Sequence, residues 1–227
     1  MKRAHRFLAS ALFACTLAAC APSAWSDEPA HVLPMPTVDM PASHDTRQTA
    51  VLAGGCFWGM EGVFEHVRGV ISARSGYAGG NATLANYELV STGTTGNAES
   101  VEIVFDPRVI SYGQILRIYF SVATDPTQLN RQGPDSGTQY RGDIFTANAD
   151  QARVARAYIA QLTTARAFSR PIVTRVDALT RFVPAEAYHQ NYLSLHPDQP
   201  YIVFNDLPKV RNLQRLYPNY YAEARVS

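Results

Sequence analysis

The chain has 227 residues, of which 46% are hydrophobic and 17% charged, a composition that suits one compact soluble domain or two small ones. Its formal net charge is +1, and no clustered basic stretch of the kind that binds nucleic acid stands out, so we expect no nucleic-acid partner.

The first 19 residues have the pattern of a bacterial secretory signal. Basic residues at Lys2, Arg3 and Arg6 precede an apolar stretch over 7–19 that is too short to anchor stably in a bilayer. We therefore expect an exported, periplasmic protein.

Two endings of this signal compete. Leu17-Ala18-Ala19-Cys20 resembles a lipobox, in which Cys20 becomes lipidated after cleavage, and Ala24-Trp25-Ser26 resembles an ordinary cleavage site. We favour the lipobox because small residues followed by cysteine form a narrow pattern. The expectation is a membrane-anchored lipoprotein, with a soluble periplasmic protein cut near Ser26 as the alternative. In a third interpretation, Cys15 and Cys20 are incidental residues of a discarded peptide.

Residues 20–47 are rich in proline and alanine, with few large apolar side chains, and are interpreted as a linker. From residue 48 the pattern is globular, without an internal repeat or a second linker. We expect one domain over 48–227, and a monomer.

Apolar patterns after residue 48 alternate between strand and helix periodicity. Strands are expected at 49–54, 69–73, 101–105, 141–146 and 172–176, with a glycine-rich turn at 76–80 and a loop at 126–137. Helices are expected from 57 to 67, from 111 to 120 behind a capping box, around 155–162, and at 186–195. The order β-α-β-β-α-β, followed by α-β-α, predicts an α/β (α+β) two-layer sandwich, with helices covering a mixed, largely antiparallel sheet.

Cys56 lies in Gly54-Gly55-Cys56-Phe57, where a strand gives way to a helix, and it is the only cysteine after residue 20. Backbone N–H groups at a helix N-terminus favour the nucleophilic thiolate. A buried core cysteine is the ordinary alternative. An unpaired thiol in an exported protein favours the reactive interpretation.

Four polar residues are candidates to assist this thiol, namely Glu99, Tyr87, Asp135 and Tyr140. Each by itself has an ordinary explanation as a solvated glutamate, a packed tyrosine or a turn aspartate. The histidines do not suggest a metal site, and His189 is expected to make a structural hydrogen bond.

Taken together with the thiol motif, these residues give the chain a strong resemblance to peptide methionine sulfoxide reductases of the A type. The matching stretches follow one another in family order over about residues 50–210. They are Gly55-Cys56-Phe57-Trp58-Gly59-Met60-Glu61, Gly76-Tyr77-Ala78-Gly79-Gly80, Thr95-Gly96-Asn97-Ala98-Glu99, Asp125-Pro126-Thr127, Arg131-Gln132-Gly133, Gly137-Thr138-Gln139-Tyr140-Arg141 and Ala187-Tyr188-His189-Gln190-Asn191-Tyr192-Leu193.

The resemblance implies an oxidoreductase that reduces methionine-S-sulfoxide, free or in oxidised proteins and peptides, as protein repair. Cys56 is then the nucleophile on sulfur, and Glu99 the acid that protonates the sulfoxide oxygen. Tyr87 and Tyr140 hydrogen-bond that oxygen, and Asp135 supports the polar network. A glutamate kept neutral by burial can supply the proton near neutral pH.

The resemblance also assigns Phe57 and Trp58 to an apolar pocket for the substrate's terminal methyl group. Attack leaves methionine and a sulfenic acid on Cys56, one step up the cysteine oxidation ladder. Many family members have histidine where this chain has Thr124 and Asn97, which puts little in doubt.

A resolving cysteine, which some family members carry near the position of Ser91 or in a C-terminal tail, is missing here. The resemblance therefore implies recycling by an external thiol, which is a thioredoxin-like protein, a glutaredoxin-like protein or a small molecule, and no bound cofactor. Two rival functions are a cysteine hydrolase that uses His189 as base, and a non-catalytic lipoprotein that keeps the scaffold for binding.

Overall fold

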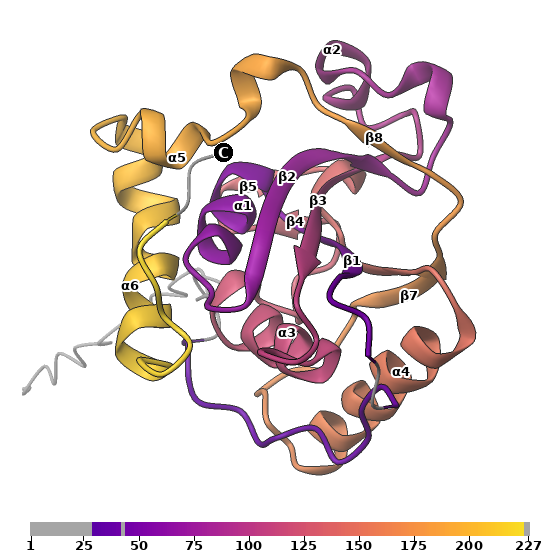
Figure 1. The fold of residues 1–227 in the computed structure, drawn as a ribbon. Coiled ribbons are helices and arrows are strands. Elements are labelled where there is room, and N and C mark those ends of the chain that lie inside the picture. The colour runs from indigo at the N-terminus through magenta and orange to yellow at the C-terminus, as the bar shows by residue number, and fades with distance from the viewer. Residues whose placement is uncertain (1–28, 42–43, 225–227) are drawn as a thin grey trace, which may run out of the picture.

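A six-stranded sheet forms the centre of the protein, whose computed structural model describes residues 29–41 and 44–224 (Figure 1). The strand order is β7-β6-β1-β3-β2-β8. Strands β6 and β7 are parallel, and the other neighbouring pairs are antiparallel. The bounds are β1 Gln48–Gly54, β2 Val70–Ala78, β3 Ala98–Phe105, β6 Gly142–Thr146, β7 Arg175–Ala178 and β8 Phe182–Pro184, with a separate small hairpin of β4 Arg131–Gln132 and β5 Asp135–Ser136.

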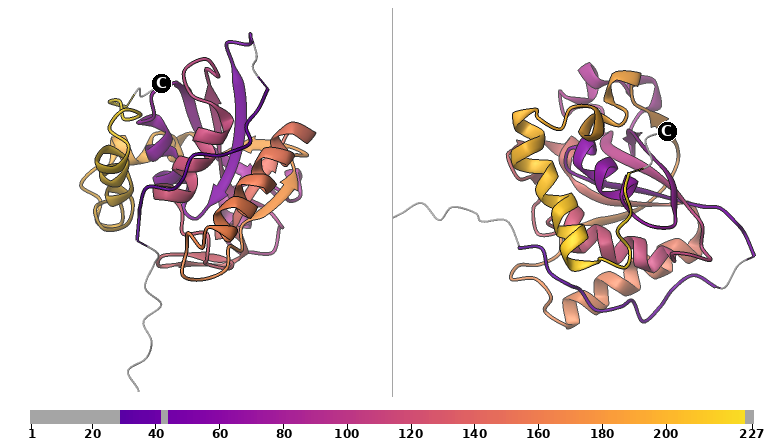
Figure 2. Two further views of the ribbon diagram at one scale, coloured as in Figure 1. Left: turned by 90° about the horizontal axis from the view of Figure 1, so that it is seen from below. Right: turned by 60° about the vertical axis from the view of Figure 1, so that its left-hand side comes forward.

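Helices cover mainly one face of this sheet. In β1, Ala50 and Leu52 point into the large core beneath the helices, and Val51 and Ala53 point into a smaller cluster on the other face. The α-helices are α1 Phe57–Glu65, α2 Tyr87–Val90, α3 Tyr112–Ile118, α4 Ala149–Thr164, α5 Tyr192–Leu195 and α6 Leu207–Leu216. Shorter helical turns are η1 Ala82–Leu84, η2 Tyr119–Ala123, η3 Thr138–Tyr140, η4 Ala187–His189 and η5 Ile202–Asp206. The views of Figures 1 and 2 place α4 and α6 on opposite flanks of the molecule.

The predicted fold class is confirmed: a mixed, mostly antiparallel sheet carries its helices as expected. The capping box is also present, because the Ser111 hydroxyl accepts from Gln114 N while the Gln114 side chain accepts from Ser111 N. Cys56 lies where β1, an inner strand of the sheet, passes into α1.

Several expected elements need correction. Strand β2 continues through Gly76 to Ala78, where a turn was predicted, because these residues pair with β3 on one side and with β8 on the other. The strand expected at 172–176 lies at Arg175–Ala178. The helix expected at 186–195 is interrupted at Asn191, which takes a left-handed conformation (φ 53°) and donates its backbone N–H to Glu61. Helix α6 was not predicted.

Residues 29–41 belong to the packed domain, which corrects their assignment to a linker. Leu33 is 1% exposed, its carbonyl accepts from Arg117 Nε at 2.7 Å, and its N–H donates to Tyr217 Oη at 3.1 Å. The carboxylate of Asp39 accepts from Gly113 N at 2.9 Å, in the first turn of α3. This segment therefore ties α3 to the C-terminal part of the chain.

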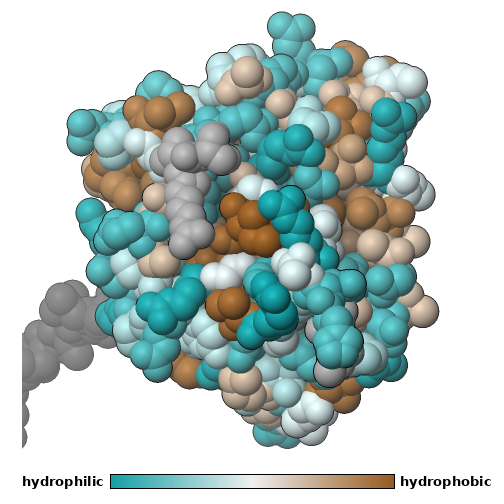
Figure 3. Space-filling view, in the orientation of Figure 1, coloured by the Kyte–Doolittle hydropathy of each residue, from teal (hydrophilic) through white to brown (hydrophobic). Residues whose placement is uncertain are grey.

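The signal segment and Cys20 lie outside the described residues. Within the described part of the chain, none of the helices has the length and apolar character to cross a bilayer. The face in Figure 3 is mainly polar, with apolar residues in small, separated groups.

Candidate active site

Cys56 is the N-cap residue of α1, directly after the turn that ends β1. Gly55 has φ of 97°, and a Cβ there would lie 2.5 Å from Cγ of Gln132, so both the backbone conformation and the space require glycine. The Cys56 side chain is 8% exposed. The turn therefore holds the thiol just below the protein surface.

The structure brings all seven predicted site residues of the domain together around one cavity of about 220 Å³. Its walls are Cys56, Phe57, Trp58, Tyr87, Glu99, Asp135 and Tyr140, together with Tyr201, which the sequence analysis missed. They come from five separate parts of the chain, so their convergence is a property of the fold.

Glu99 is 3% exposed, and its Oε2 accepts a hydrogen bond from Phe57 N at 3.0 Å. Burial raises the pKa of this carboxyl to about 8, although the Phe57 N–H opposes the shift. Nearby Asp135 and Asp206 raise the pKa further. Glu99 is therefore protonated at neutral pH, the form that donates a proton.

The expected thiolate at Cys56 is not the resting state. Burial raises the pKa of the thiol well above its usual value, and Glu99 and Asp206, when ionised, add to this effect. The N–H of Trp58 lowers the pKa, as expected at a helix N-terminus, but it does not overcome desolvation. The cavity thus holds a neutral thiol beside a neutral carboxyl.

Tyr87, the first residue of α2, and Tyr140, the last residue of η3, line the same cavity as Cys56. Burial raises the pKa of both phenols, and the charge of Glu99 acts in the same direction. Both hydroxyls therefore keep their protons and are hydrogen-bond donors. Tyr87 is held by its own N–H, which donates to Glu186 Oε1 at 2.9 Å.

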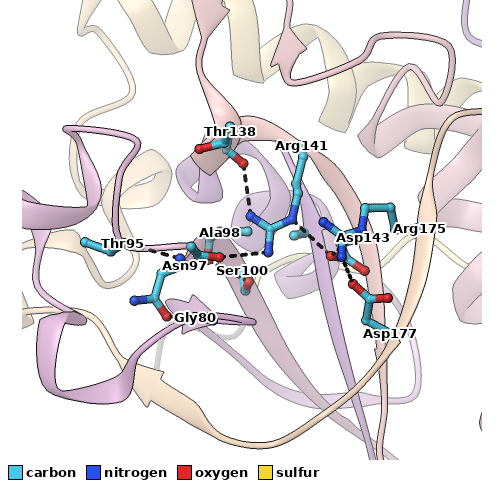
Figure 4. A network of polar contacts seen from close by, with 12 residues as sticks. Gly80, Thr95, Asn97, Ala98, Ser100, Thr138, Arg141, Asp143, Arg175 and Asp177 are labelled. Atoms are coloured by element: carbon cyan, nitrogen blue, oxygen red, sulfur yellow. Dashed lines mark hydrogen bonds and ion pairs between the residues drawn. The ribbon is translucent and has the colours of Figure 1, made fainter.

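Arg141 connects the turn before Glu99 to the turn that carries Tyr140 (Figure 4). Its guanidinium donates to Gly96 O at 3.1 Å, to Thr138 O at 3.1 Å and to Asp143 Oδ2 at 3.0 Å. The Arg141–Asp143 ion pair is buried, with side chains 7% and 0% exposed. A guanidinium donates its hydrogen bonds in fixed directions, so Arg141 holds the loop of Gly96 and the loop of Thr138 at a set distance from each other.

Asn97 holds the neighbouring turn (Figure 4). Its Oδ1 accepts from Gly80 N at 3.2 Å, and its Nδ2 donates to Asn81 O at 2.9 Å. Asn97 therefore connects the end of β2 to the start of β3.

Trp58 and Phe57 form the aromatic wall. The Trp58 ring stacks on Tyr192 with centroids 3.8 Å apart, and its Nε1 donates to His189 Nδ1 at 3.1 Å. Phe57 is 1% exposed and packs against the His189 ring. The structural hydrogen bond expected of His189 is confirmed.

These contacts argue against the cysteine hydrolase. A general base must have a ring nitrogen directed at the thiol. His189 instead accepts from Trp58 at Nδ1, its Nε2 lies 4.0 Å from Glu186 Oε2, and no hydrogen bond joins it to Cys56. Burial also lowers the pKa of the ring, which makes it a weaker base. In the described residues, no group of three or more His, Cys, Asp or Glu residues is arranged to hold a metal ion.

Three further residues complete the site. The Tyr201 hydroxyl donates to Asp135 Oδ2. The carboxylate of Asp206 is 0% exposed and accepts from Lys209 Nζ at 3.2 Å. A Cβ on Gly59 would lie 2.0 Å from Asp206 Oδ1, so this pair lies against the first turn of α1. No local motif marks these residues, because they reach the thiol only through tertiary packing.

Comparison with known proteins gives one consistent result. A family model described as peptide methionine sulfoxide reductase matches residues 48–220. Peptide methionine sulfoxide reductase MsrA 2 of Mesorhizobium japonicum is 58% identical over 179 residues, which cover 79% of this chain and 92% of that protein. MsrA 2 of Synechocystis is 51% identical over 189 residues, covering 82% and 88%.

Solved structures agree with the sequence relatives. Methionine sulfoxide reductase A of Corynebacterium diphtheriae superposes with a TM-score of 0.58 at 32% identity, covering 74% of this chain and 85% of that one. Reduced Mxr1 of Saccharomyces cerevisiae gives a TM-score of 0.61 at 28% identity, covering 70% and 90%.

Proposed function

The chain belongs to the peptide methionine sulfoxide reductase family, and from this premise we propose that Cys56 and Glu99 carry out its reaction. The activity is that of a peptide-methionine (S)-S-oxide reductase, with a role in protein repair. The assignment of roles to individual residues is our proposal. The observation that carries it is the neutral, buried carboxyl of Glu99 in one cavity with the thiol.

Sulfoxide reduction transfers oxygen from substrate sulfur to Cys56. The oxygen is a poor leaving group until it is protonated, and Glu99 supplies that proton. The Cys56 sulfur bonds to the substrate sulfur, and its thiol proton passes to the Glu99 carboxylate. Migration of the hydroxyl to Cys56 then releases methionine and leaves a sulfenic acid. The hydroxyl keeps the proton that Glu99 supplied, and the thiol proton replaces it on Glu99, which is thereby restored.

Hydrogen bonds from Tyr87 and Tyr140 hold the oxygen while its charge changes. Donors fixed in place before the reaction stabilise developing charge without reorganising. The wall of Phe57 and Trp58 takes the terminal methyl group. A fixed methyl and a fixed oxygen together select one configuration at sulfur.

Recycling requires an external thiol. Among the described residues Cys56 is the only cysteine, and the sequence has no cysteine after it. The sulfenic acid therefore has no resolving cysteine within its domain. A thioredoxin-like protein, a glutaredoxin-like protein or a small-molecule thiol supplies two thiols, which leave as a disulfide while the oxygen leaves as water.

Single turnover tests these assignments. Without reductant, the enzyme should release one methionine per chain from the S epimer of a blocked methionine sulfoxide, and none from the R epimer. A dimedone-type reagent should then trap Cys56 as the sulfenic acid. Mass spectrometry that instead finds a Cys20–Cys56 disulfide would overturn external recycling.

We further propose export with a lipid anchor on Cys20, or soluble export after cleavage near Ser26. The basic and apolar pattern of residues 1–20 supports this proposal. Mass spectrometry of the mature N-terminus from membrane and soluble fractions separates the two. An N-terminus that still begins at Met1 contradicts both.

A further inference from the structure

Cys56 lines a second cavity, of about 240 Å³. This cavity shares Cys56, Asp135 and Tyr201 with the substrate cavity. Its remaining walls come from other elements, chiefly the segments 120–125 and 204–212. The hydrogen-bonded pair of Tyr201 and Asp135 stands where the two cavities meet, so the sulfur is approached from two different sides.

The two sides differ in chemistry. The groups that bind the sulfoxide oxygen, Glu99, Tyr87 and Tyr140, all line the first cavity. After sulfoxide reduction the oxygen is bonded to the Cys56 sulfur and lies within reach of those groups. A thiolate displaces hydroxyl from sulfur by approaching along the S–O axis from the far side. The reductant therefore needs a route that does not begin among the oxygen-binding groups.

The second cavity carries a cation that suits an incoming thiolate. Lys209 lines it, with its side chain 20% exposed, and Asp206 holds its Nζ at 3.2 Å. Burial raises the pKa of Cys56, as do Glu99 and Asp206, whereas the Lys209 ammonium acts in the opposite direction. Lys209 therefore offsets part of the negative charge of Asp206, which would otherwise oppose a thiolate on the reductant or on the departing Cys56.

We propose that the second cavity is the binding site for the sulfur-bearing end of the reducing thiol, an inference that rests on the proposed external recycling. The incoming thiolate forms an S–S bond to Cys56 as the S–O bond breaks, and the hydroxyl takes a proton from Glu99 and leaves as water. A second thiol attacks the reductant sulfur of this mixed disulfide. Cys56 is reduced by two electrons and reprotonated, and the two thiols leave as a disulfide.

Filling the cavity should separate the two half-reactions. Asn212 lines it from α6, and neighbouring Arg211 is exposed to solvent on the same helix. Asn212→Trp places a bulky ring at the cavity wall, and Arg211→Trp is the matched control. Asn212→Phe replaces the first variant if that protein does not fold, as judged by circular dichroism.

Two rates are measured in the full chain: methionine release in the first turnover, and loss of the dimedone-reactive sulfenic acid after adding thiol. Asn212→Trp should slow sulfenic acid reduction at least about tenfold and change methionine release less than about twofold. Arg211→Trp should change neither. Equal slowing of both steps, or unchanged reduction, overturns the proposal. Absence of any sulfenic acid in the unsubstituted enzyme is a failure of external recycling instead, and is seen before a variant is made.

The source of the thiol is resolved by using dithiothreitol and a thioredoxin as separate reductants. Slowing with either reductant supports the site, and the reductant that is slowed is the one that enters the cavity. Lys209→Met should weaken the use of anionic glutathione more than that of uncharged dithiothreitol, and Lys209→Arg should restore it. Equal effects on the two thiols contradict the role given to the cation.

Discussion

Helix α1 has one buried glutamate beside its N-terminus and another in its middle, and burial raises the pKa of each carboxyl to about 8. At the N-terminus this residue is Glu99, from β3, and in the middle it is Glu61, from α1 itself. Their exposed fractions are 3% and 1%. The two carboxyls are therefore alike in burial and protonation, and only Glu99 shares a cavity with Cys56.

Their hydrogen bonds explain the different uses of one chemical group. Glu61 accepts from Ser75 N at 3.2 Å, from Ser75 Oγ at 2.9 Å and from Asn191 N at 3.1 Å, which joins α1 to β2 and to the segment before α5. Glu99 accepts from Phe57 N and otherwise faces the cavity. A raised pKa shows that a carboxyl is desolvated, whatever its role. An acid catalyst differs from a structural carboxyl because its oxygens face a cavity that a substrate can enter.

The largest effect should come from removing the thiol at the N-terminus of α1. Cys56→Ser should abolish sulfoxide reduction, because a hydroxyl is far less acidic and nucleophilic than a thiol. Methionine release in a single turnover measures this loss, and circular dichroism and urea denaturation check the fold. Substantial activity in a folded Cys56→Ser protein would falsify the mechanism.

Glu99→Gln should slow the first turnover about 10²–10⁴-fold, the usual contribution of a proton donor. The unsubstituted enzyme should lose rate as pH rises through about 8, where the Glu99 carboxyl ionises. The variant should lack that fall, and its deficit should be smaller at low pH, where solvent acid partly substitutes. Identical single-turnover profiles from pH 5 to 9 would remove Glu99 from the role of acid.

Removal of the two phenol hydroxyls should have an intermediate effect. Tyr87→Phe and Tyr140→Phe should each cost about tenfold, because the remaining donor partly covers for the lost one. The double variant should cost about 10³-fold, more than the roughly hundredfold product of the two single losses and comparable to the loss of an oxyanion donor. Single-turnover rates of the unsubstituted enzyme, the two single variants and the double variant form a double-mutant cycle. Strict additivity of two small effects would mean that the hydroxyls act independently on different groups.

The sequence analysis identified the seven cavity residues through the family resemblance, and five of them, at 56–58, 99 and 140, lie in the matching stretches themselves. It missed Tyr201 because its partner, Asp135, lies 66 positions away in the chain. It missed Lys209 because α6 reaches the site only through packing against α1, which no local pattern marks. The helix expected at 186–195 fails for a related reason. The left-handed turn at Asn191 is fixed by a distant acceptor, Glu61.

The protonation state of Cys56 shows a second limit of prediction from sequence. The N-cap position of Cys56 was read correctly from the strand-to-helix turn, and the helix N–H groups do lower its pKa. The prediction of a thiolate was wrong because the opposing effect of burial depends on the packing of the whole domain. Likewise, residues 29–41 look like a linker by composition, and the buried Leu33 shows otherwise.

The smallest effect on activity, and the sharpest test of the comparison, should come from Glu61→Gln. A glutamine offers one acceptor oxygen where the carboxyl offers two, so donors from Ser75 and Asn191 lose a partner. At pH 5 this should lower the free energy of unfolding by about 1–3 kcal/mol, the cost of an unsatisfied buried group. First-turnover methionine release should stay within about threefold of the unsubstituted enzyme, far from the loss in Glu99→Gln.

The contribution of Glu61 to the free energy of unfolding should decrease as pH rises. Because folding raises the pKa of Glu61 from 4.5 to about 8, the folded state binds more protons than the unfolded state between these values, and stability falls as pH rises through this window. Glutamine does not titrate, so the variant escapes this part of the loss. Urea denaturation at pH 5, 7 and 9 should show the gap between the two proteins closing as pH rises. A constant gap would mean that folding does not raise the pKa of Glu61. Activity lost as severely as in Glu99→Gln would erase the distinction between the two carboxyls.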